Sequence, residues 1–99
     1  MDLTKQQINF VYASEADLLN VALFGTTAME WRIANPDKEG NIRDYTHIEQ
    51  LVVLSNLESI NNVLISQVLA QSERLVQLNK IAITQMTSLI NNRQLKKLK

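Results

Sequence analysis

The residues best suited to chemistry gather in one stretch, "EWRIANPDKEGNIRDYTHIEQ", residues 30–50. It holds the only proline, tryptophan and histidine of the chain and one of its two glycines. A catalytic role for His47 would need a nucleophile and an orienting group around it. A zinc site normally takes three or four ligands, and no second histidine and no cysteine is available. We therefore expect an ordinary histidine in the first turn of a helix.

Other reaction chemistry has little support in the sequence. The serines lie in helical contexts, and none sits in the glycine-rich elbow that exposes a nucleophile. Asp37, Glu39 and Asp44 line a loop, but a lysine and an arginine fall among the positions where a calcium site needs oxygen donors. Gly40 alone does not make a phosphate-binding run of glycines. We expect neither an enzyme nor a bound metal or cofactor.

The aromatic and basic residues of this stretch allow two interpretations. In the first they form a recognition surface. In the second the loop is structural: Trp31 and Tyr45 plug the bottom of a helical hairpin, and polar residues satisfy buried backbone. A charge-assisted Arg43–Asp44 pair would then staple the loop to a helix. The candidate recognition residues are Trp31, Arg32, Asn41, Arg43, Asp44 and Tyr45.

Capping signals predict the short helices that would hold this stretch. Thr4 with Gln7 and Thr27 with Glu30 have capping-box spacing, in which two side chains satisfy each other's backbone N–H groups. Gly25 is well placed to end a helix in a left-handed conformation, and the residue before Pro36 disfavours helical angles. Thr46 with Glu49 is a further capping box. The expected elements are helices at 5–12, from Ser14 to Gly25 and at 28–34, and a loop at 35–45.

From residue 46 onwards the chain has no glycine or proline. In the second half of this stretch apolar residues recur every seven positions in two stripes, one of Leu75, Ala82 and Leu89 and the other of Leu69, Val76, Ile83 and Ile90. Such a repeat suits knobs-into-holes packing of long helices. We predict a helical hairpin, about 46–69 and 72–93, with Ser72 capping the second helix and the three short helices packed on it. If the break fails, the two halves would pair with a second copy as an exchanged dimer. The candidate interface residues are Leu69, Leu75, Val76, Leu78, Ala82, Ile83, Met86, Leu89 and Ile90.

The length indicates one domain over residues 1–99, and the helix signals above make it all-α. Apolar residues make up 45% of the chain, which suits a globular protein. There is no cysteine, and no apolar run approaches the roughly 18 residues that a membrane span needs. The N-terminus does not resemble a signal peptide. We expect a cytoplasmic protein with no membrane or small-molecule partner.

Charge is balanced overall but unevenly placed. Residues 1–59 hold nine acids and four bases, whereas residues 60–99 hold one acid and six bases. This asymmetry has three interpretations: a basic tail for nucleic acid, two oppositely charged ends that attract within one chain or between two copies, or an ordinary basic helix end. The candidate nucleic-acid contacts are Arg93, Lys96, Lys97 and Lys99. Four phosphate contacts would give weak, salt-sensitive binding.

Three segments carry a family resemblance. They are "YASEADLLNVALFGTTAMEWR", "NPDKEGNIRDYTHIEQLVVLSNLESIN" and "QSERLVQLNKIAITQMTSL". Together they resemble the C-terminal region of bacterial and phage KilA-N domain proteins over nearly the whole chain. Members of that family carry a DNA-binding module upstream of this region, and these 99 residues do not contain it. The resemblance implies a DNA-associated protein of phage or mobile-element ancestry.

One departure from the family bears on the architecture. The family often has a glycine, and sometimes a proline, around the position of Val68 to Ser72, and this chain has neither. The alternatives to the hairpin are therefore a continuous helix or an exchanged dimer. On function, we expect a non-enzymatic interaction and oligomerisation module whose partners are a second copy or related KilA-N proteins. The alternative is direct nucleic-acid binding by the 35–45 loop and the basic tail.

Overall fold

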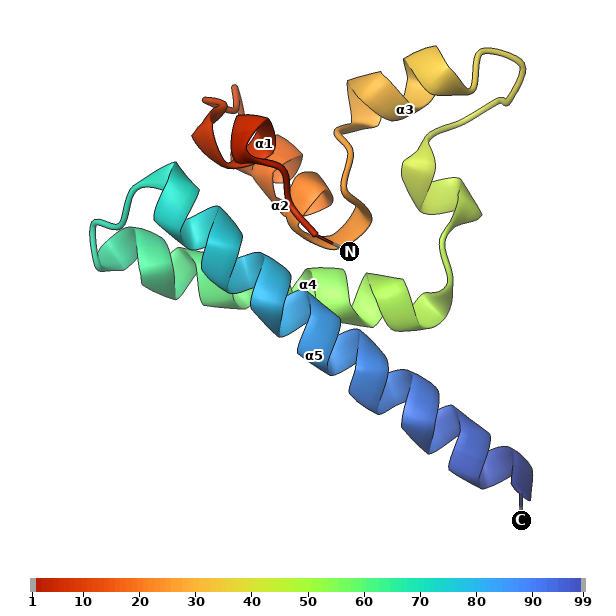
Figure 1. Ribbon diagram of the computed structural model, residues 1–99. Helices are drawn as coiled ribbons and strands as arrows, with labels where there is room; N and C mark the ends of the chain where they lie inside the picture. Colours follow the sequence, from red (N-terminus) through yellow and green to blue (C-terminus); the bar gives the residue numbers. More distant parts are fainter. Residues whose placement is uncertain (1, 99) are drawn as a thin grey trace.

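The computed structural model describes residues 2–98, with side chains as far as Asn91, and within that range it is all-helical. The predicted all-α fold is confirmed, and the two long helices form the predicted hairpin (Figure 1). The elements are α1 (Lys5–Asn9), α2 (Glu15–Phe24), α3 (Ala28–Ala34), the 3-10 helix η1 (Ile42–Tyr45), α4 (Ile48–Ser66) and α5 (Gln71–Leu98).

The hairpin turn is made by a left-handed residue that is not glycine. Val68 has φ 60°, directly after the C-cap of α4. The amide of Val68 donates to the carbonyl of Ile65 at 2.9 Å, and the amide of Leu69 donates to that of Leu64 at 3.4 Å. These two bonds make a Schellman motif, which usually has glycine at this position. The break is therefore real, and a continuous helix is wrong.

The capping signals located most helix starts but not all. Thr4 and Thr27 make the predicted capping boxes, and Gly25 ends α2 with φ 76°. The Thr46 cap is wrong, because the Thr46 hydroxyl donates to the carbonyl of Arg43 at 2.9 Å and closes η1; α4 starts one residue later, after His47. The Ser72 cap is also wrong, since α5 already includes that residue.

Tertiary contacts shorten the first helix. It ends at Asn9 rather than near residue 12, and Phe10 is already extended, with ψ 139°. The reason lies in α5: the Gln71 side chain accepts a bond from the Tyr12 amide at 2.9 Å and donates to the Tyr12 carbonyl at 3.1 Å. Both polar groups of the Tyr12 backbone therefore bind α5 instead of continuing the helix.

The core lies where α2 meets the hairpin. α2 packs against both α4 and α5, and α1 packs against α5. Fully buried leucines from all three longer helices meet there, with Leu18, Leu57, Leu75 and Leu78 each at 0% exposure. Burying one such side chain stabilises the fold by about 1.5–3 kcal/mol.

The third short helix does not follow the prediction. α3 packs mainly against η1, and Figure 1 shows the two standing beside the hairpin rather than on it. The loop of residues 35–45 is also less irregular than expected, because its last four residues form η1. Ile42, at 6% exposure, is the buried residue of η1.

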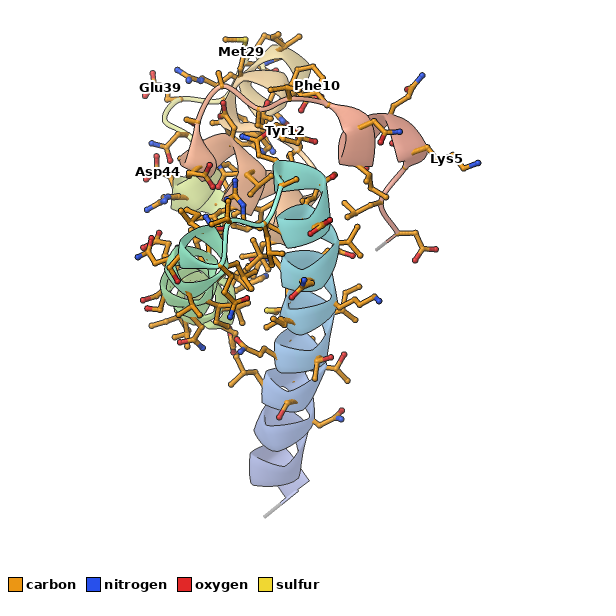
Figure 2. The ribbon with its side chains drawn as sticks, turned by 90° about the vertical axis from the view of Figure 1, so that its left-hand side faces the viewer. Lys5, Phe10, Tyr12, Met29, Glu39 and Asp44 are labelled. Carbon is orange, nitrogen blue, oxygen red and sulfur yellow. The ribbon has the colours of Figure 1, made fainter. Side chains whose placement is uncertain are left out.

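α5 is much longer than the helix it packs on. It has 28 residues against 19 for α4, or about 42 Å against about 28 Å at 1.5 Å per residue. Its C-terminal part projects beyond all other elements (Figures 1 and 2). Within the described part of the chain, no helix combines the length and the apolar character that a membrane crossing requires.

Candidate functional site

A buried polar cluster fixes α5 against α2 and α4. The guanidinium of Arg74 donates to Glu15, to the Asn61 side-chain oxygen at 2.9 Å and to the Leu69 carbonyl at 3.1 Å. The Asn61 amide also donates to Glu15 at 2.8 Å. Hydrogen bonds from Arg74 hold the pKa of the Glu15 carboxyl below its ordinary value, against an opposing effect of burial. Farther along, the Asn79 amide donates to the Ala22 carbonyl at 3.0 Å.

This cluster positions α5 and leaves no reactive group open. Each charge in it is paired, and a buried arginine with three partners holds a geometry rather than a substrate. The cluster matters for function because it sets the direction in which the long helix leaves the body.

The structure divides the predicted interface residues, which lie on α5 and at Leu69 of the turn before it, into two sets. Leu75, Leu78 and Ala82 are buried inside the chain itself, and Leu69, Met86 and Leu89 are partly buried against the same core. The other seven-residue stripe stays open to different degrees: Val76 is half-buried, Ile83 is 42% exposed and Ile90 is 36% exposed. The stripe of Leu75, Ala82 and Leu89 is therefore mostly covered by the rest of the chain, and we call it the inner stripe. The stripe of Val76, Ile83 and Ile90 lies along the surface, and we call it the outer stripe.

A shallow groove of about 240 Å³ runs beside the open stripe. Ala22 and Leu23 of α2 form one wall, and Ile83, Met86 and Ile90 of α5 form the other. The groove lies where α5 begins to leave the body, so apolar side chains of two elements face the same space.

A larger groove of about 610 Å³ lies at the opposite end of α5. It is lined by α1, by the extended residues 10–13 and by the start of α3. Phe10, Val11 and Met29 line it and are 60%, 81% and 68% exposed. Figure 2 shows Phe10 and Met29 at the same end of the molecule.

The floor of this larger groove is tied to the start of α5 through Tyr12. The phenol of Tyr12 donates to the carbonyl of Gln7 at 2.8 Å, and its ring meets that of Phe10 edge-on at 4.9 Å. Burial raises the pKa of the Tyr12 phenol, and the nearby Glu30 carboxylate adds to this effect. Asp17, Glu30 and Arg32 are the charged residues of the lining.

The predicted recognition loop forms a small aromatic cluster. The rings of Trp31 and Tyr45 lie 5.3 Å apart at an angle of 36°. The ammonium of Lys38 lies 5.3 Å from the Tyr45 ring and 6.0 Å from the Trp31 ring. Tyr45 is 51% exposed and donates to the Glu39 carbonyl at 2.8 Å. The two rings brace the loop against α3 and do not plug the hairpin, so that expectation is wrong.

The polar residues of the loop also pair differently from the prediction. Arg43 forms a 3.7 Å ion pair with Glu58 of α4, where both side chains are about half exposed. Asp44 accepts a bond from the amide of Asn41 at 2.9 Å and so caps η1. A Cβ at Gly40, which has φ 84°, would lie 2.3 Å from the Asp44 carboxylate. The expected Arg43–Asp44 staple is replaced by these two separate bonds, while Arg32 stays exposed on α3.

The structure adds no metal site for the remaining candidates that its described residues include. His47 is exposed ahead of α4, and its amide donates to the Gln50 side chain at 2.9 Å. No group of three or more His, Cys, Asp or Glu side chains suited to a metal ion occurs in the part of the chain that the structure describes. The candidate nucleic-acid contacts, Arg93, Lys96, Lys97 and Lys99, lie outside the residues whose side chains are described.

Sequence reasoning missed the polar residues that orient α5. The pattern of apolar residues did not reveal Arg74, Asn61 and Gln71, because such a pattern identifies apolar positions as buried and treats polar positions as exposed. A signal was available for Arg74, since it lies four residues before Leu78 and so shares a helix face with it. No match was found for this chain among protein-family models, curated proteins or solved structures.

Proposed function

We propose that this chain is a helical self-association module, related to the C-terminal region of KilA-N proteins and acting without catalysis. The observation that carries the proposal is the long α5. Its outer stripe, Val76, Ile83 and Ile90, runs along the surface of α5 up to the point where the helix leaves the body, beside an apolar groove. Apolar side chains repeating every seven residues along one helix are typical of a surface that packs on a second helix.

Helix energetics support the same proposal. An isolated helix shorter than about 12–15 residues is marginal in water, and packing supplies most of its stability. The part of α5 beyond Leu89 projects from the body and lies past the last described side chain in contact with the core. A second α5 laid along the outer stripe would add packing on the open side of the helix.

In a KilA-N protein, self-association would place two DNA-binding modules side by side. Linking two modules turns the second binding event into an intramolecular one and raises the effective concentration on DNA. The DNA contact itself is assigned to an upstream module, as the family resemblance implies.

The test uses two exposed stripe residues whose replacement leaves the core intact. We expect Ile83→Glu combined with Ile90→Glu to lower the association constant at least tenfold, because facing carboxylates would lie in an apolar contact. Light scattering across a dilution series measures it, with circular dichroism to verify helicity. Val52→Glu, at a 48% exposed position of α4, is the control and should associate like the parent. Equal association of all three proteins would refute the role of the stripe.

A second candidate function is direct nucleic-acid binding by the loop. It is favoured by the partly exposed Trp31–Tyr45 pair with Lys38 above it and Arg43 nearby, since bases stack on aromatic rings next to cations. Gel shifts at low and high salt, with Arg43 and the C-terminal lysines replaced, would test it. A shift at low salt that the replacements abolish supports this function, and no shift at low salt removes it.

A further inference from the structure

We propose that the 610 Å³ groove between residues 10–13 and α3 receives the basic C-terminal end of α5 from a second copy of this chain. The inference rests on the proposed self-association and adds its direction: the two α5 helices run antiparallel. The observations that carry it are the sequence of the stripes, the position of the groove and the distribution of charge.

Both stripes of α5 turn from apolar to basic at the same point. One runs Leu75, Ala82, Leu89 and then Lys96; the other runs Val76, Ile83, Ile90 and then Lys97. Each lysine takes the position that continues its seven-residue repeat. A partner that follows the stripes must therefore be apolar along the middle of α5 and acidic beside its last turns.

The groove lies where an antiparallel partner helix would end. Tyr12, which lines it, is bonded through its backbone to Gln71, the first residue of α5. In an antiparallel pair centred near Ile83, the last turns of one α5 lie beside the first turns of the other. The C-terminal end of each helix then reaches the groove of its partner.

Charge at this end of the molecule is complementary to the helix end. Asp17 and Glu30 line the groove against one base, Arg32, and exposed Glu73 lies in the first turn of α5. Along the chain, residues 1–59 hold nine of the ten acids, whereas the last seven residues hold four cations. The exposed Phe10, Val11 and Met29 side chains would meet the leucines of that segment, Leu95 and Leu98.

A two-fold axis follows from this arrangement. Because each copy offers one groove and one basic helix end, an antiparallel pair satisfies both sites at once and closes as a dimer. Two charge contacts and two apolar contacts then form together, so the dimer should weaken as salt rises.

The experiment uses the absence of cysteine in the chain. Met29→Cys, in the groove, is mixed with Lys97→Cys, and disulfide-linked heterodimers are quantified after mild oxidation. Ile48→Cys, at a 74% exposed position on the first residue of α4, replaces Met29→Cys in the control mixture. We expect at least fivefold more heterodimer with Met29→Cys than with Ile48→Cys, and loss of that excess in high salt.

The outcomes separate this inference from the proposed function. Dimers by light scattering with equal cross-linking in the two mixtures would refute the groove while leaving self-association intact. Monomers by light scattering with no cross-linking would refute both. A charge-reversal pair provides a second test that does not depend on cysteine. Lys97→Glu alone should associate more weakly than the parent, and mixing it with Asp17→Lys should restore association. Unchanged association of Lys97→Glu, or no restoration in the mixture, would contradict the charge pairing.

Discussion

At the scale of single residues, polar pairing inside an apolar core directs this fold. Arg74 is buried at 6% exposure and donates to groups of α2, of α4 and of the hairpin turn. One side chain thus ties three elements together. The bonds of Arg74 therefore help to fix the direction of α5 relative to α2 and α4.

Removing Arg74 should cost more than removing a surface charge. We expect Arg74→Ala to lower the free energy of unfolding by about 2 kcal/mol, because the Asn61 side chain and the Leu69 carbonyl lose a buried donor. Urea denaturation at one fixed protein concentration measures it, since association also affects apparent stability. Lys80→Ala, on an exposed position of α5, is the control and should change stability by less than about 0.5 kcal/mol. Equal effects of the two variants would contradict the role of the cluster.

The lowered pKa of the Glu15 carboxyl predicts that the stability of the fold depends on pH. Its pKa is lowered in the folded chain, so its stabilising effect is complete above the unfolded pKa, about 4.3, and is lost as pH falls through the folded value. The urea midpoint of the parent should exceed that of Glu15→Gln at pH 7, and the gap should close as pH falls below the unfolded pKa and through the lower folded one. A gap that stays constant over this range would show that the carboxylate charge does not contribute.

At the scale of elements, the hairpin depends on a strained turn. Val68 holds a left-handed conformation that costs an L-residue about 1–2 kcal/mol. The strain persists because Leu64 and Leu69, on either side of the turn, are packed against the core. The turn is therefore imposed by packing and not by the residue at its centre.

Glycine at this position should relieve the strain. We expect Val68→Gly to raise the free energy of unfolding by about 1 kcal/mol, after the entropy cost of glycine is subtracted. Val68 is 90% exposed, so no packing is lost. Val63→Gly, in the interior of α4, should instead lower stability by about 0.5 kcal/mol, from helix propensity. A drop in stability for Val68→Gly in thermal or urea unfolding would contradict the account of the turn.

The helices show which features of the fold could be predicted from the sequence and which could not. Thr4, Ser14, Thr27 and Gly25 act locally, so their caps were predictable. The end of α1 and the break at Val68 depend on contacts with distant residues, and no local signal marks them. The same limit applies to the site: the seven-residue repeat located the stripes of α5, but only the packing of α2 and α4 decides which stripe is covered.

At the scale of the whole molecule, the body is complete on one side of α5 and open on the other. α2 and α4 cover the inner stripe, and the outer stripe lies partly exposed beside the edge of α2. Acidic residues crowd the first part of the chain and basic residues the last. A second copy in antiparallel orientation would cover the stripe and pair the charges in a single arrangement.

The mass of the particle in solution tests this account most directly. Sedimentation equilibrium of the parent chain, from about one to a hundred micromolar at low salt, should give about twice the 11.3 kDa of one chain at the upper end. The mass should fall toward one chain on dilution or in high salt. A value of 11.3 kDa at every concentration would contradict self-association through α5.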